Sequence, residues 1–231
     1  MIRKFLIVGN RPWCNKVFNS LKIKDCKFYF YKNENQFNLK NIKKIRPEKI
    51  FILHWNFFVP KKIYQNYECI VFHMTDLPFG KGGSPLQNLI MRGYKHSKLS
   101  SIKCAEKIDS GPIYLKKKYS LSGTATEIFA RIGKISILMI KSIIKNTIVP
   151  KKQKGKSITF KRRTLSQNDL SNAKNITEVY NMIRMLDGEL YPKAYLNFFK
   201  FKIMFNKANL KNNKLISQVE FIKNDKIKKY T

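Results

Sequence analysis

Runs of consecutive apolar residues alternate with helix-like segments along the first half of the chain. A run in which every residue is apolar is typical of a strand buried on both faces, whereas apolar residues three and four apart mark one face of a helix. The alternation is that of βαβ units, and it predicts a parallel sheet covered by helices. We expect strands at 5–8, 27–31, 50–55 and 69–75, and helices starting near Pro12 and over 36–45.

The pattern changes after the fourth strand. A glycine-rich loop at 78–85 lets the backbone approach a ligand closely, and a short helix at 86–92 follows it. Two further strands are expected at 99–104 and 112–118. Thr124 and Glu127 have the spacing of a capping box, which predicts the start of a long amphipathic helix.

The chain divides into three parts. We expect a main domain at 1–148, a basic linker at 149–173 that wraps back over it, with a short strand at 157–160, and a small C-terminal extension at 174–231. The extension begins with a helix capped by Asn175, continues with one or two strands within 194–205 and ends in a basic tail. The predicted fold class is therefore α/β: a Rossmann-like open sheet with a helix-plus-strand extension.

Composition supports a folded protein. The 231 residues are 43% hydrophobic and 13% aromatic, enough for one full domain and an appendage. No apolar run approaches the roughly 18 residues that cross a bilayer, and the first apolar stretch is too short for a secretory signal. The four cysteines lie far apart, so neither a zinc site nor a redox pair is indicated. We expect a cytoplasmic protein without a membrane partner or a bound metal.

The net charge of +33 has two interpretations. A chain this basic could bind nucleic acid or another acidic surface. Its lysines are scattered among many asparagines and isoleucines, however, as a coding sequence rich in A and T would produce without selection. We favour this compositional bias over a specific phosphate site.

Polar residues follow two of the predicted strands. In an open parallel sheet, ligands bind beyond the carboxyl ends of the strands, where His54 and His73 lie. Asp109 is on an Asp-Ser-Gly turn that faces the same edge. A carboxylate can orient an imidazole and stabilise its protonated form, so His73 and Asp109 are candidates for a general-base couple. The two residues alone are weak support, because a single histidine on an apolar strand more often packs than catalyses.

Two motifs make the couple more specific. Residues 72–78, Phe-His-Met-Thr-Asp-Leu-Pro, followed by Gly-Gly-Ser-Pro at 82–85, resemble the formyltransferase signature Asn-x-His-x-Ser-Leu-Leu-Pro with its Gly-x-x-Pro extension. Residues 109–113 match the second signature, Asp-x-Gly-x-Ile, at the separation that the family shows. The similarity continues through 183–187 and 191–194, segments like those that follow the catalytic domain of methionyl-tRNA and sugar formyltransferases.

The resemblance implies a formyltransferase: a substrate amine attacks the formyl carbon of the co-substrate N10-formyltetrahydrofolate. This acyl transfer needs a proton acceptor and a donor for the tetrahedral oxyanion. By analogy, His73 would deprotonate the amine or hydrogen-bond the oxyanion, and Asp109 would hold His73 near the folate. The pterin pocket of the family corresponds here to two segments, of which we expect folate contacts from Phe57, Phe58, Val59, Glu106, Lys107 and Ile108.

One position departs from the signature. Val71 stands where the family has asparagine, and a valine side chain cannot donate a hydrogen bond. Losing one oxyanion donor typically costs about 2.7–4 kcal/mol of transition-state stabilisation. Asn56, Thr75 and His54 are candidate replacements, because all three lie at strand ends aimed at the same edge. We expect Asn56 and Thr75 to belong to the catalytic site.

The resemblance indicates the acceptor of the formyl group less directly. Little chain remains after residue 195 for a large tRNA-binding domain, so we expect a nucleotide-linked amino deoxysugar of bacterial surface-glycan biosynthesis. Its diphosphate would bind the loop residues Lys81, Gly82, Gly83 and Ser84 or the basic segment 161–163. Three alternatives stay open: a methionyl-tRNA formyltransferase, a formyltetrahydrofolate hydrolase and a non-catalytic binding relative. The sequence also leaves open a homodimer formed through the last 40 residues.

Overall fold

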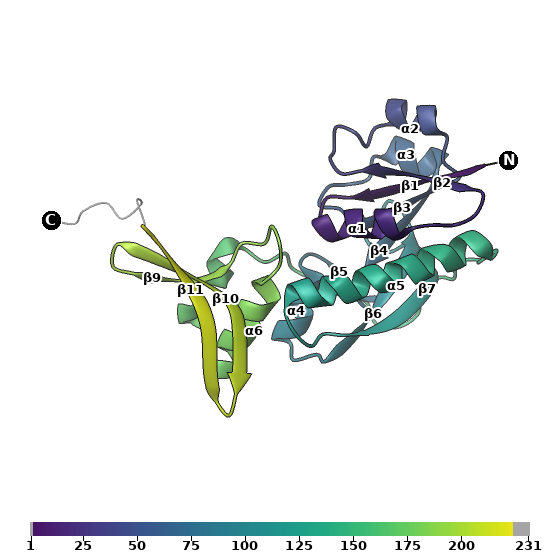
Figure 1. The fold of residues 1–231 in the computed structure, drawn as a ribbon. Coiled ribbons are helices and arrows are strands. Elements are labelled where there is room, and N and C mark those ends of the chain that lie inside the picture. The colour runs from purple at the N-terminus through teal and green to yellow at the C-terminus, as the bar shows by residue number, and fades with distance from the viewer. Residues whose placement is uncertain (1, 224–231) are drawn as a thin grey trace.

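The computed structural model describes residues 2–223, and a six-stranded sheet forms the centre of the larger part (Figure 1). The strand order is β2-β1-β3-β4-β6-β7, in which the first four strands are parallel and β6 is antiparallel to both of its neighbours, β4 and β7. This confirms the predicted α/β class with an open sheet. The strands are β1 (Arg3–Gly9), β2 (Cys26–Tyr31), β3 (Lys49–His54), β4 (Glu68–His73), β6 (His96–Lys103) and β7 (Ile113–Ser120).

Both faces of this sheet are covered by helices. Phe5 and Ile7 of β1 belong to the core cluster that contains α1 and α5, whereas Leu6 and Val8 belong to the cluster that contains α2 and α3. Alternate residues of one strand therefore enter different cores, which explains why the strand is apolar at every position. The helices of this part are α1 (Pro12–Ser20), α2 (Leu39–Ile45), α3 (Lys61–Asn66), α4 (Pro85–Met91) and α5 (Ala125–Lys145).

Helix α5 begins where the capping box predicted it. Thr124 Oγ1 accepts a hydrogen bond from the Glu127 amide at 3.3 Å, and the Glu127 carboxylate accepts one from the Thr124 amide at 2.7 Å. The helix has 21 residues and buries the stripe of Ile128, Ile132 and Met139. Among the helices that the structure describes, none is long and apolar enough to span a membrane.

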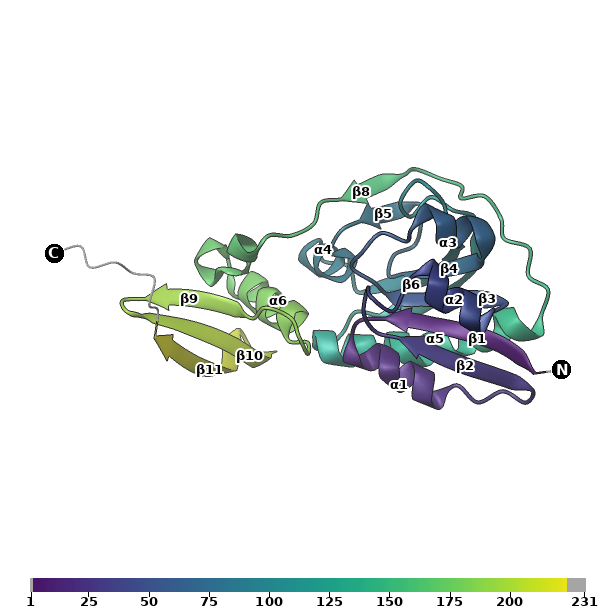
Figure 2. The ribbon, with the colours of Figure 1, turned by 90° about the horizontal axis from the view of Figure 1, so that it is seen from above.

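The segment after α5 returns along the sheet and covers the glycine-rich loop. Within it, β8 (Ile158–Phe160) pairs in parallel with β5 (Phe79–Gly82) of that loop, as Figure 2 shows from above. This confirms the strand predicted at 157–160 and the wrapping of the linker. Two turns of 3-10 helix, at Leu165–Asn168 and Leu170–Asn172, lead into the C-terminal part.

The C-terminal part consists of α6 (Ile176–Leu186) packed on an antiparallel three-stranded sheet that stands to one side of the main domain (Figure 1). The Asn175 cap is confirmed, because its side chain accepts a hydrogen bond from the Glu178 amide at 2.9 Å. This sheet is larger than the one or two strands predicted within 194–205. Its strands are β9 (Ala194–Phe198), β10 (Phe201–Lys211) and β11 (Lys214–Lys223), and the predicted basic tail lies outside the described residues.

We predict that Gly111→Ala is strongly destabilising. A Cβ atom at Gly111 would lie 1.7 Å from the Lys103 carbonyl oxygen, so the backbone of the turn between β6 and β7 has to move. We expect a loss of about 3 kcal/mol in the free energy of unfolding, measured by urea denaturation. Gly93→Ala is the matched control: Gly93 has φ +78° but no atom within 4 Å of its added Cβ, so only the backbone cost of about 1–2 kcal/mol applies. Equal losses in the two variants would contradict the predicted contact.

Candidate functional site

His73 and Asp109 meet at the carboxyl edge of the parallel strands. His73 is the last residue of β4, and Asp109 lies in the turn between β6 and β7. His73 Nδ1 is 3.4 Å from Asp109 Oδ2, and the two side chains are 9% and 11% exposed. The predicted proximity is therefore confirmed, and the pair is nearly shielded from water, where electrostatic interactions are strong.

The other ring nitrogen of His73 is also engaged. His73 Nε2 lies 2.7 Å from the carbonyl oxygen of Gly80, and the Thr75 hydroxyl donates to the same oxygen at 3.2 Å. Both ring nitrogens of His73 therefore face oxygen atoms, one from the Asp109 carboxylate and one from the Gly80 carbonyl. In this loop conformation the Gly80 carbonyl therefore occupies the hydrogen-bonding position of Nε2.

The Asp109 carboxylate is fixed from two sides. Its Oδ2 atom accepts a hydrogen bond from the Gly82 amide at 2.9 Å, and its backbone is in the left-handed region with φ +50°. The Gln153 side-chain amide donates to the carbonyls of Asp109 and Gly111 at 2.8 and 2.9 Å. Gln153 comes from the linker and belongs to no motif, so sequence analysis did not single it out.

The linker covers the predicted phosphate-binding loop. A Cβ atom on Gly82 would lie 2.7 Å from the Phe160 carbonyl oxygen, and one on Gly83 would lie 2.6 Å from the Cα of Arg162. Ser84 Oγ accepts a hydrogen bond from the Arg163 amide at 3.1 Å. On the side where the linker passes, these glycines accommodate protein backbone. Lys81 points the other way, and its ammonium donates to Ser110 Oγ at 3.1 Å, beside Asp109.

The two segments assigned to the folate lie together at the edge next to Asp109. Lys61, just after the first segment, forms an ion pair with Glu106 of the second at 3.8 Å, and Val59 and Cys104 pack in the same cluster. Phe58 is 79% exposed. Exposed aromatic rings beside the couple suit a flat heterocycle such as a pterin. Phe57, Lys107 and Ile108 are exposed as well.

The candidate replacements for the family asparagine differ in access. Val71 is on the same face of β4 as His73, two residues earlier, and packs against the cluster of α2 and α3. Thr75 is fully buried, and its hydroxyl is committed to the Gly80 carbonyl. Asn56 is exposed. Of these two residues, only Asn56 therefore presents its side-chain amide to a substrate in this conformation.

His54 ends β3 beside this edge and is held neutral. Its Nδ1 atom is buried without a hydrogen-bond partner, and its ring packs edge-on against Trp13 and Phe129. Burial, followed by the charges of Arg11 and Arg162, lowers the pKa of His54 to about 3. A neutral imidazole here can accept or donate a hydrogen bond at neutral pH but carries no charge.

Comparison with known proteins shows which proteins this chain is similar to. Residues 165–222 match the family model of the methionyl-tRNA formyltransferase C-terminal domain. A solved methionyl-tRNA formyltransferase from Clostridium thermocellum is 40% identical, with a TM-score of 0.92, over 96% of this chain and 99% of that one. A methionyl-tRNA formyltransferase from Rickettsia prowazekii (strain Madrid E) is 29% identical over 72% of this chain and 56% of its own length, so the chain spans about half of that curated relative. A sugar N-formyltransferase from Shewanella, 16% identical with a TM-score of 0.69 over 90% and 98% of the two chains, shares the fold.

We predict that His54 makes stability depend on pH in the acidic range. The folded state keeps His54 neutral, whereas the unfolded chain protonates it below its ordinary pKa of about 6.5. The unfolded state then binds more protons, so this contribution is present above pH 6.5 and is lost as the pH falls toward 3. Between pH 7 and pH 5, we expect a loss of roughly 2 kcal/mol from this residue.

The test is urea unfolding of the wild type, His54→Gln and His96→Gln at both pH values. The stability difference between pH 7 and pH 5 should shrink by roughly 2 kcal/mol in His54→Gln. His96 is exposed, so its variant should keep the wild-type difference. An unchanged difference in His54→Gln would show that the ring is protonated in the folded protein.

Proposed function

Because this chain belongs to the formyltransferase family, we propose that it transfers the formyl group of N10-formyltetrahydrofolate to a substrate amine. The observation that carries the proposal is the contact of His73 with Asp109, two residues that lie on both family signatures and meet at 3.4 Å beside exposed aromatic residues. The cytoplasmic location and the homodimer expected from the sequence remain predictions.

Formyl transfer requires that one proton is moved and that one developing negative charge is stabilised. The amine nitrogen bonds to the formyl carbon, the bond from that carbon to N10 breaks, and the proton lost by the amine is finally carried by N10 of tetrahydrofolate. His73 takes up or donates that proton at Nε2 once the Gly80 carbonyl has moved, and Asp109 stabilises the protonated ring. The exposed Asn56 is the residue we assign to the oxyanion in place of the family asparagine.

We propose an aminoacyl-tRNA as the acceptor. The relative from Clostridium thermocellum has nearly the same length as this chain, since the match covers 99% of it, and it is a methionyl-tRNA formyltransferase. A short C-terminal part therefore does not exclude a tRNA as the acceptor. Residues 165–222 also match the C-terminal domain model of that enzyme. The sugar acceptor expected from the sequence becomes the second candidate, supported by fold similarity alone.

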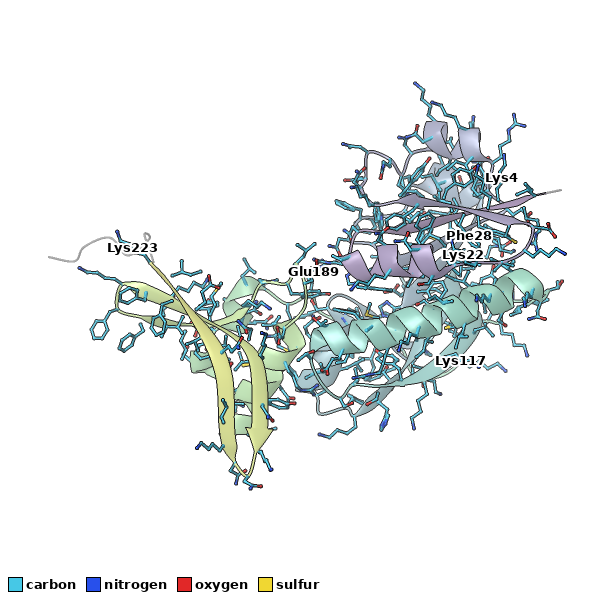
Figure 3. All side chains as sticks on the ribbon, viewed as in Figure 1. Lys4, Lys22, Phe28, Lys117, Glu189 and Lys223 are labelled. Atoms are coloured by element: carbon cyan, nitrogen blue, oxygen red, sulfur yellow. The ribbon has the colours of Figure 1, made fainter. Side chains whose placement is uncertain are left out.

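The net charge of +33 suits a polyanionic acceptor, but it does not show where on the protein the acceptor binds. In Figure 3 the labelled Lys22 and Lys117 lie on the main domain, on either side of α5, and Lys223 lies on the C-terminal sheet, so positive charge occurs on both parts of the molecule. A spread charge attracts RNA at long range. Orientation of the acceptor must come from a more local arrangement of side chains.

We predict that His73→Gln lowers the kcat of formyl transfer by about 10²–10⁴-fold, because the amide cannot accept a proton. The assay measures formyl incorporation into methionyl-tRNA from N10-formyltetrahydrofolate by mass. His96→Gln is the matched control, since His96 is exposed at the start of β6 and should leave kcat within about twofold. Normal transfer by the His73 variant would refute the mechanism, and formate release without an acceptor would identify a hydrolase.

We predict that tRNA binding is both selective and salt-dependent. If the protein contacts about three phosphates, its affinity for tRNA should fall roughly 40-fold between 50 and 200 mM KCl. A double-stranded RNA of similar length serves as the comparison in the same filter-binding experiment. Selective recognition predicts at least about tenfold tighter binding of methionyl-tRNA at 150 mM KCl. Equal affinity for both RNAs would mean that the scattered lysines bind RNA without recognising the acceptor.

A further inference from the structure

Two arginines from distant segments, Arg11 and Arg162, lie near the same two rings, those of His54 and Tyr191. Arg11 lies between the end of β1 and Pro12, the first residue of α1, and Arg162 follows β8 in the linker. Arg11 stacks on the Tyr191 ring at 4.7 Å and donates to the Leu190 carbonyl at 2.8 Å. Both guanidinium charges lower the pKa of His54, and burial of that ring lowers it further. The same two charges also lower the pKa of Tyr191, whereas burial raises it.

These charges lack a carboxylate partner. Within residues 2–223, neither Arg11 nor Arg162 forms an ion pair with Asp or Glu, and the neighbouring Arg163 forms none. Arg163 is half-buried, and its Nε atom has no hydrogen-bond partner. Bringing like charges together costs free energy that a bound anion would recover. The planar guanidinium favours a phosphate group, which it can bind through two parallel hydrogen bonds.

A set of unpaired polar atoms lies next to these arginines. Buried atoms without a hydrogen-bond partner are Asn10 Oδ1, Arg11 Nε, Trp13 Nε1 and His54 Nδ1. They form one neighbourhood, because the Asn10 amide donates to the His54 carbonyl at 3.0 Å and the Trp13 and His54 rings are 6.1 Å apart. A buried polar atom that is left unpaired destabilises the folded protein. Native structures contain few of them, so four together indicate groups kept for a ligand.

The position of these arginines and unpaired atoms relative to His73 suits the binding of the acceptor. The strands β1, β3 and β4 are neighbours in the sheet, so the ends that carry Asn10, His54 and His73 follow one another along the same edge. The segment 105–108, which we expect to contact the folate, follows β6, the neighbour of β4 on the side away from β3. A donor and an acceptor that flank one imidazole from opposite sides can both reach it.

We propose that Arg11 and Arg162 bind a phosphate group of the acceptor, and that Asn10, Trp13 and His54 hydrogen-bond the polar groups next to that phosphate. This inference rests on the proposed function and names the part of the acceptor that the site recognises. It also gives the orienting contact that the spread surface charge lacks. Both a tRNA end and a nucleotide-linked sugar carry phosphate, and we commit to the tRNA end because of the acceptor argument above.

The test compares acceptors that differ in phosphate. Methionyl-tRNA carries phosphates, whereas methionyl-adenosine presents the same amine without one. In Arg11→Gln and Arg162→Gln, we expect the KM for methionyl-tRNA to rise about tenfold each, with kcat and the KM for N10-formyltetrahydrofolate within about twofold. The KM for methionyl-adenosine should stay unchanged. A rise in the folate KM instead would reassign the arginines to the folate and overturn the proposal.

Control variants separate binding from folding and from total charge. Lys145→Gln removes one charge at the end of α5, beside the start of β1 and so at the opposite edge of the sheet, and should leave every KM within about twofold. Arg11→Lys keeps the charge but loses the planar donor set, so it should show an intermediate KM for methionyl-tRNA. The thermal midpoint of each variant is measured alongside. If Lys145→Gln raises the KM as much as Arg11→Gln does, general charge explains binding and the proposal fails.

One outcome would contradict the proposed acceptor without contradicting the phosphate site. If the wild type does not formylate methionyl-tRNA, transfer to a dTDP-linked 4-amino sugar and calorimetric binding of AMP test the same arginines. Loss of AMP binding and a tenfold higher KM for the sugar nucleotide in Arg11→Gln would keep the phosphate site and change the acceptor. Wild-type AMP affinity in both arginine variants would overturn the phosphate site itself.

Discussion

The site depends on where the Asp109 carboxylate is held. One oxygen of that carboxylate accepts the Gly82 amide and faces His73, so a single atom joins the glycine-rich loop to the imidazole. The turn that carries Asp109 is fixed by the close approach of Gly111 to the Lys103 carbonyl and by the Gln153 clamp. Since three separate segments position one charged group, the couple is a property of the whole edge of the sheet, and neither signature could form it alone.

The sequence predicted those features that depend on neighbouring residues. Apolar runs such as 5–8 located strands that are buried on both faces, and the capping residues Thr124 and Asn175 located the starts of two helices. Two ordered motifs located His73, at the end of β4, and Asp109, in the turn after β6, and these two side chains are in contact. Local patterns and a family signature were therefore sufficient for the fold class and for the couple.

Features that arise from contacts between distant segments were not predictable in this way. Helix α3 buries only Ile63, so it has no apolar stripe to reveal it, and most residues of β11 are exposed, so this strand adds little to the apolar core that strand patterns reveal. The contact of Arg162 with Gly83 and the clamp by Gln153 join the linker to loops some 40 to 80 residues earlier, without any motif. The length of the C-terminal part does not discriminate between the acceptors, because a solved structure of matching length is named a methionyl-tRNA formyltransferase.

The pairing of β5 with β8 links access to His73 to the course of the linker. The carbonyl next to His73 Nε2 belongs to Gly80, in the strand β5 that pairs with β8, the last strand before the C-terminal part. The placement of that carbonyl, and with it the access to the imidazole, therefore depends on where the linker lies along the glycine-rich loop.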